Sequence, residues 1–210
     1  TNMLAVFVCL GLLLLIAQYL QLVLGLSPLV AGLWTVPASI AAIVGSMTAP
    51  RLVRHLRPAA IVGGSLGVCA AGLLLLVLAD GRYGLEVAVV AMVAMFLGIS
   101  MTMTLCTDLI VASAPPERAG AASAISEAGG EMGGALGIAL LGSLALLVYR
   151  AAIENAGVPA DLAGLSFADA VAVTTDRAAD EARDLVRSAF VAALEITAAF
   201  AAALAAGAAV

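Results

Sequence analysis

Two carboxylates with helical spacing lie in a long apolar stretch of this 210-residue chain. Glu127 and Glu131 fall within the run 117–148, where their neighbours are small or apolar. A carboxylate at the centre of a bilayer costs about 2.5–3.5 kcal/mol on an insertion scale, so such residues usually mark an ion or proton pathway. Residues four apart share a helix face, where two ionised carboxylates repel each other. We therefore expect one glutamate to stay protonated, and the pair to exchange a proton or bind a cation.

The depth of this pair depends on where its helix begins. Pro116 suits the first turn of a helix. At 1.5 Å per residue, Glu127 lies roughly 16 Å and Glu131 roughly 22 Å along that helix. The hydrocarbon core of a bilayer is about 30 Å thick, so both carboxylates are expected inside it. A helix that begins later would place them at an aqueous edge instead.

A stripe of glycines runs beside the two glutamates. Overlapping G-x-x-x-G steps allow another helix to approach closely. At 100° per residue, the glycines lie off the glutamate face. One side of the helix is therefore expected to pack and the other to face a cavity. The stripe consists of Gly129, Gly130, Gly133, Gly134 and Gly137.

Other polar side chains in the apolar runs are weaker candidates for the same pathway. Asp108 precedes the turn at Pro115 by roughly 10 Å, and it lies either in the inner leaflet or at the cytoplasmic edge. Gln18, Tyr19 and Gln21 lie near the outer end of the first apolar run. They either bond to neighbouring helices or line a substrate path.

The composition places these residues in a membrane. Hydrophobic residues make up 64% of the chain and charged residues 11%, against about a half and a quarter in soluble domains. A lipid bilayer is therefore the expected surrounding, and a soluble enzyme is excluded. A net charge of −5 argues against a nucleic-acid partner. A single histidine and three scattered cysteines predict no metal site, and no nucleotide-binding or other cofactor motif occurs.

Six apolar segments are long enough to span a bilayer, which needs about 20 residues each. The predicted fold class is therefore an all-α membrane protein with six transmembrane helices. Residues 1–149 are expected to hold helices one to five, 150–187 an extracytoplasmic loop with a helical hairpin, and 188–210 helix six. The hairpin is either a solvated connector or a cap over a pathway exit. The predicted spans are approximately 3–25, 29–49, 59–79, 86–112, 117–148 and 188–210.

The distribution of arginines predicts the orientation. Arg51, Arg54 and Arg57 lie between spans two and three. The positive-inside rule puts this loop in the cytoplasm, so both ends of the segment are cytoplasmic and 150–187 lies outside. Because the chain starts almost directly in its first span, we expect it to be a piece of a longer polypeptide.

A short repeat favours an internal symmetry. The pattern P-x-x-A-G occurs at 28–32 and again at 116–120. Each copy opens the second helix of a set of three, on opposite membrane faces in the predicted topology. A three-plus-three inverted repeat produces this relation.

These motifs resemble a known family. YLQLVLGLSPLVAG, followed by Pro37, resembles the opening of the C-terminal half of major facilitator superfamily drug pumps, in particular the 14-helix drug:proton antiporters of the quaternary-ammonium-resistance type. APPERAGAASAISEAGGEMGGALGIALLGS is similar to their penultimate helix, and 150–187 to the loop before their last helix. The Arg51–Arg57 loop departs from the pattern G-x-x-x-D-R-x-G-R, because Pro50 stands where an acid is expected.

The resemblance implies export of lipophilic cations in exchange for protons across the plasma membrane. It assigns proton or cation binding to Glu127 and Glu131, and Asp108 stays a third candidate from its place in an apolar run alone. It also implies that the N-terminal half of the transporter is missing from this chain. Two alternatives stay open: a transporter of an uncharged metabolite on the same fold, and a truncated membrane module that does not transport.

Overall fold

A computed structural model describes residues 1–77, 84–156, 165–176 and 180–209 of the chain. Within these ranges the regular secondary structure is entirely helical. The elements are α1 (Asn2–Gln18), the π-helical turn η1 (Tyr19–Val23), α2 (Pro28–Leu52), α3 (Pro58–Leu76), α4 (Gly84–Ala112), the 3-10 turn η3 (Pro116–Arg118), α5 (Ala119–Asn155), α7 (Phe167–Asp176) and α8 (Asp180–Ala208).

In the described part of the chain, six helices are long and apolar enough to cross a membrane. The predicted fold class, an all-α membrane protein with six spans, is confirmed. α5 and α8 extend furthest beyond the predicted spans: α5 continues to Asn155, and α8 begins at Asp180. The added turns carry charged residues such as Glu154 and Asp184, which a search for apolar runs leaves out.

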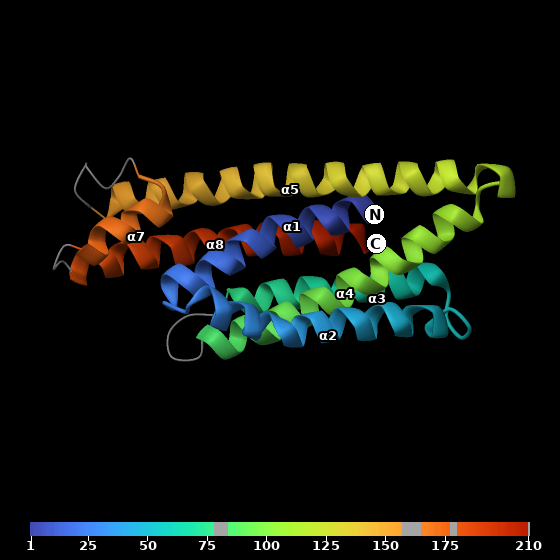
Figure 1. Cartoon of the computed structure of the whole chain (residues 1–210), viewed down its shortest axis with the longest axis horizontal. Coiled ribbons are helices and arrows are strands. Elements are labelled where there is room, and N and C mark those ends of the chain that lie inside the picture. The colour runs from blue at the N-terminus through green and yellow to red at the C-terminus, as the bar shows by residue number, and fades with distance from the viewer. Residues whose placement is uncertain (78–83, 157–164, 177–179, 210) are drawn as a thin grey trace.

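The spans form two groups of three (Figure 1). In one group α1 packs along α5, with α8 beside them; in the other, α4 packs against both α2 and α3. Contacts between α3 and α8 join the groups. α2 and α5 lie at opposite edges and bury only 22% and 28% of their apolar windows, whereas α8 buries 50%. The two edge helices therefore present most of the unpaired apolar surface.

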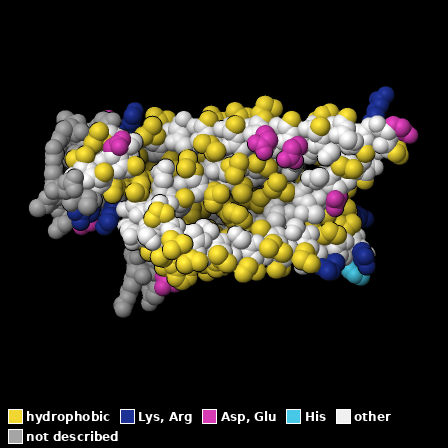
Figure 2. All heavy atoms as spheres, in the orientation of Figure 1, with side chains coloured by type: hydrophobic (Ala, Val, Ile, Leu, Met, Phe, Trp, Pro, Cys, Tyr) yellow, Lys and Arg dark blue, Asp and Glu magenta, His cyan; other side chains and the backbone are white. Residues whose placement is uncertain are grey.

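The two ends of the bundle differ in chemistry. The turn between α2 and α3 lies at the same end as η3, and α7 lies at the opposite end beside α5 and α8 (Figure 1). Arginines and the single histidine gather at the α2–α3 turn (Figure 2). α2 and α5 begin at opposite ends, as the two P-x-x-A-G copies lead one to expect.

Local sequence signals explain where α2 begins. Gly25 has a φ of 69°, a left-handed conformation that glycine adopts without steric cost, and it turns the chain after η1. The Ser27 hydroxyl accepts a hydrogen bond from the Val30 amide at 3.4 Å, and Pro28 occupies the first helical turn. These residues fix the short connection from α1 to the edge helix α2.

The contact between α3 and α4 contains a buried polar pair. The hydroxyls of Ser65 and Thr102 lie 2.8 Å apart, and each also bonds to a carbonyl of its own helix. The two helices approach closely here, since a Cβ atom added to Gly98 would overlap the Ser65 carbonyl oxygen. Hydrogen bonds between membrane helices contribute about 0.6 kcal/mol on average.

Replacing Ser65 with alanine is therefore expected to lower the free energy of unfolding by about 0.6–1 kcal/mol. Denaturation of the purified protein in mixed micelles measures this change. Ser39→Ala is the matched control, because the exposed Ser39 hydroxyl bonds only to the Thr35 carbonyl in its own helix. Equal stability losses in the two variants would contradict a role for the Ser65–Thr102 contact.

Candidate cation and proton site

α5 carries the two glutamates in the first half of a long, unbroken helix. After η3, the helix runs from Ala119 to Asn155, which places Glu127 and Glu131 in its third and fourth turns. Both side chains are exposed in this chain. Figure 2 shows acidic side chains over the middle of α5, surrounded by hydrophobic ones. The sequence around them is Gly- and Ala-rich, so no large neighbour on α5 covers the carboxylates.

The glycine side of α5 lies directly against α1. A Cβ atom added to Gly133 would overlap the Met3 carbonyl oxygen, and one added to Gly137 would overlap the Phe7 carbonyl oxygen. Only glycine permits this approach of the two backbones. The contact sets the rotation of α5 about its axis and leaves the glutamates off the α1 interface.

The remaining glycines of the stripe differ in their surroundings. A Cβ atom at Gly134 would overlap the end of the Leu10 side chain, and one at Gly130 would lie 3.7 Å from Val6, an ordinary contact. A Cβ atom at Gly129 would meet nothing within 4 Å. The close approach therefore belongs to the C-terminal part of the stripe, from Gly133 to Gly137, and not to its beginning.

A polar contact between α1 and α5 lies next to Glu127. The Asn2 side-chain amide donates a hydrogen bond of 3.3 Å to the Ser126 hydroxyl. The side-chain oxygen of Asn2, Oδ1, is buried and has no hydrogen-bond partner in the described part of the chain. Sequence reasoning missed this residue, because an asparagine at the very start of an apolar run carries no pattern of its own.

Asp108 lies on α4 about one turn before the helix ends at Ala112. Its side chain is exposed and lines a pocket of about 230 Å³. The other walls are apolar and come from the ends of α2 and α4, the α2–α3 turn and the start of α3. They are Pro50, Val53, Pro58, Leu105, Leu109 and Ala112.

The three basic residues of the α2–α3 turn are all exposed. The Arg51 guanidinium donates a hydrogen bond of 2.7 Å to the Met47 carbonyl one turn earlier. Arg54 lies in the turn, and Arg57 is the capping residue of α3. The turn places positive charge beside the pocket that contains Asp108.

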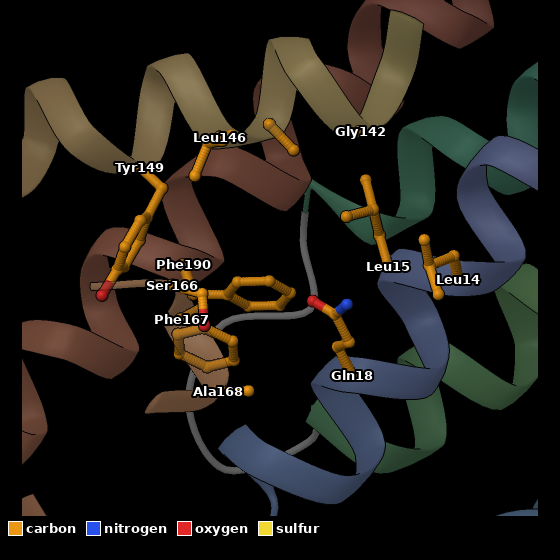
Figure 3. A pocket seen from close by; sticks show the side chains of 11 residues that line it. Leu14, Leu15, Gln18, Gly142, Leu146, Tyr149, Ser166, Phe167, Ala168 and Phe190 are labelled. Atoms are coloured by element: carbon orange, nitrogen blue, oxygen red, sulfur yellow. The ribbon is translucent and has the colours of Figure 1, made fainter. Parts of the chain in front are cut away.

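The polar residues at the end of α1 have different surroundings. Gln18 is half-buried and lines a second pocket (Figure 3). Tyr19, expected on the same path, is 2% exposed and packs in the core. Gln21 is exposed. A π-helical turn covers Tyr19–Val23, and its wider repeat means that residues three apart no longer share a face.

Within the described ranges, no group of three or more histidine, cysteine, aspartate or glutamate side chains could hold a metal ion. The α5 carboxylates lie on a side of the helix that α1 leaves open.

Six apolar helices long enough to cross a bilayer, in the part of the chain that the structure describes, define a multi-pass membrane protein. The sequence profile described as Major Facilitator Superfamily matches residues 1–138. The chain belongs to this superfamily, and it forms half of the superfamily's fold.

Curated relatives agree with this membership. The chain is 36% identical over 195 residues to "Multidrug efflux pump LfrA" of Mycolicibacterium smegmatis, covering 90% of this chain and 38% of the relative. It is 32% identical over 151 residues to "Puromycin resistance protein pur8" of Streptomyces alboniger, covering 70% and 30%. It is 32% identical over 168 residues to "Methyl viologen resistance protein SmvA" of Salmonella typhimurium, covering 80% and 33%. The chain thus spans about a third of the length of these relatives.

Proposed function

We propose that this chain is the C-terminal half of a proton-coupled exporter of lipophilic cations in the plasma membrane. The observation that carries the proposal is the position of Glu127 and Glu131, exposed in the third and fourth turns of an apolar helix whose other side packs on α1. Burying a carboxylate in a bilayer costs free energy, so carboxylates in membrane spans are rare and usually mark an ion or proton pathway. The names of the relatives support drug export, and methyl viologen is itself an organic cation.

The proposed cycle uses the two carboxylates in turn for a cation and for protons. With the site open to the cytoplasm, deprotonated carboxylates attract a lipophilic cation. With the site open to the outside, protons neutralise the carboxylates and the cation leaves. Return to the cytoplasmic side and loss of the protons complete one exchange. Two negative charges one turn apart favour binding of either a cation or a proton, which couples the two fluxes.

The missing partner of this half is the preceding part of a longer polypeptide. α2 and α5 expose apolar side chains along their length, and the largest exposures include Leu29 at 75% and Ile125 at 74%. The glutamates lie on one of these two edge helices. An N-terminal half that packs between α2 and α5 would cover this surface and enclose the carboxylates in a cavity, and alternating access needs two such halves.

The positive-inside rule favours an orientation with the arginine turn in the cytoplasm and α7 outside. The Asp108 pocket then opens at the cytoplasmic edge, where a cation arrives. We propose that Asp108 attracts the cation there before it reaches the α5 carboxylates.

Asp108→Asn is expected to raise the KM for ethidium export by up to about fivefold, the effect of an ion pair worth up to 1 kcal/mol. The maximal rate is expected to stay unchanged. The initial rate of efflux from cells that express the full-length transporter, measured over a range of ethidium concentrations, gives both parameters. Glu117→Gln is the matched control, since it removes an exposed charge at the same end outside the pocket. A KM that changes equally in both variants would contradict a local role for Asp108.

Collapse of the proton gradient tests the proposed function as a whole. Cells expressing the full-length polypeptide are loaded with ethidium, and efflux is followed by fluorescence with and without a protonophore. We expect efflux above the empty-vector rate, and a return to that rate when the protonophore is added. Efflux that continues unchanged without a proton gradient would favour a transporter of a different class.

A further inference from the structure

A second pocket lies where four helices meet, at the end of the bundle that carries α7. Its volume is about 230 Å³. Figure 3 shows α5 on one side, α1 on the other, and aromatic rings from α7 and α8 between them. Its lining consists of Leu14, Leu15, Gln18, Gly142, Ala145, Leu146, Tyr149, Ser166, Phe167, Ala168 and Phe190.

We call this second pocket the outer pocket. Three aromatic rings build one of its walls. The Phe167 ring of α7 stacks on the Phe190 ring of α8, with centroids 3.9 Å apart and planes inclined by 13°. Tyr149 of α5 meets Phe167 edge-on, with centroids 5.7 Å apart. All three side chains are at most 6% exposed. Because the rings come from three helices, the wall is fixed by mutual packing and is already formed without a ligand.

The other walls are apolar except for the Gln18 amide and the Ser166 hydroxyl. No charged side chain lines the outer pocket in the part of the chain that the structure describes. The half-buried Gln18 side chain extends toward the Phe190 ring (Figure 3). An amide can both donate and accept hydrogen bonds, so Gln18 can bind an amino or hydroxyl group at the edge of a ring.

The outer pocket lies on the same side of α5 as the glutamates. Tyr149 follows Glu131 by about five helical turns, and Ala145 follows Glu127 by the same interval, so each pair has nearly the same direction around the axis. Gly142 lies about 16 Å along the helix from Glu131. A molecule released outward from the carboxylates along this side of α5 therefore reaches the pocket next.

We propose that the outer pocket is a binding subsite for the planar aromatic part of an exported cation. An apolar cavity of about 150 Å³ holds one benzene ring, so the outer pocket has room for one ring or a fused pair. It is smaller than sites that enclose whole drug-sized ligands, which measure about 300–1,000 Å³. The cationic group stays at the mouth in water, because the lining offers no counter-charge. This subsite rests on the proposed export function and adds a preference for ring-bearing cations.

Filling the pocket tests the proposal. A Cβ atom at Gly142 would meet nothing within 4 Å, so Gly142→Leu places a side chain in the pocket without a backbone clash. Gly67→Leu is the matched control: a Cβ at Gly67 on α3 also meets nothing within 4 Å, and Gly67 lies outside the pocket. The probes are ethidium, which has fused rings and amino groups, and tetrapentylammonium, which has no rings.

Binding is measured on the purified full-length transporter in lipid nanodiscs. We expect Gly142→Leu to raise the Kd for ethidium at least about fivefold, to change that for tetrapentylammonium less than about twofold, and Gly67→Leu to change neither. Gln18→Leu, which keeps the side-chain size, is expected to weaken ethidium binding alone. An unchanged ethidium Kd in both Gly142→Leu and Gln18→Leu overturns the proposal. Equal losses for the two probes also overturn it. A pocket that takes any apolar chain, or a variant that is damaged as a whole, would weaken binding of both probes alike.

Export in cells separates this proposal from the proposed function. If the wild-type transporter exports neither probe, the export function fails, and the Kd values still decide whether the ring subsite exists. If it exports both probes but Gly142→Leu slows neither, the export function stands and the ring subsite is overturned.

Discussion

Replacing Glu127 and Glu131 together with glutamine is expected to reduce ethidium export by the full-length transporter to the empty-vector rate. Glutamine keeps the size and the hydrogen-bonding capacity of the side chain but can neither lose a proton nor attract a cation by charge. Both carboxylates lie within the apolar span of α5, where charge interactions are screened less than in water. The loss is measured as the initial efflux rate from preloaded cells, corrected for the amount of protein in the membrane.

Two controls locate the effect. Glu154→Gln removes a carboxylate from the same helix, but at its C-terminal end, and is expected to leave export within about twofold of wild type. The single variants Glu127→Gln and Glu131→Gln show which carboxylate is needed for protons, by their activity at different external pH values. Wild-type export by the double variant would remove the pair from the mechanism.

Replacing Gly137 with leucine is expected to have the largest effect on the fold. A Cβ atom there would overlap the Phe7 carbonyl oxygen, so α1 and α5 have to separate along their contact. Overpacking of this kind costs about 1–3 kcal/mol or more. We expect little folded protein in the membrane, and a lower unfolding temperature for the fraction that can be purified in detergent.

Gly129→Leu is the matched control for this variant. It makes the same substitution in the same helix and the same stripe, at a position where a Cβ atom meets nothing within 4 Å. Yield and unfolding temperature are expected to stay close to wild type. Equal losses in the two variants would mean that leucine is not tolerated anywhere in this helix, and would contradict the specific α1–α5 contact.

The number and order of the spans could be predicted because lipid demands long apolar helices, and such helices dominate this sequence. Their ends could not be predicted to the same degree. α8 begins at Asp180, within the segment 150–187 for which a helical hairpin running into the last span is predicted, so only its apolar part lies in the predicted span 188–210. The π-helical turn at Tyr19–Val23 contains no proline or glycine from which it could be predicted.

The candidate site was predictable in its residue types but not in its surroundings. A pair of carboxylates is easy to recognise in an apolar run. Which glycines of the stripe contact α1, however, depends on where α1 crosses α5. This crossing brings Gly133 and Gly137 against α1 and leaves Gly129 open. The contact between Phe167 and Phe190 joins residues whose sequence spacing carries no signal, so the outer pocket could not be foreseen.

Proton release on binding of a cation tests the central claim most directly. Purified full-length transporter in weakly buffered detergent solution is mixed with ethidium while a pH indicator is read. Competition between a cation and protons for Glu127 and Glu131 predicts that the wild-type protein acidifies the solution on binding and that the double glutamine variant does not. Binding without proton release by the wild type, or equal release by the double variant, would contradict the account.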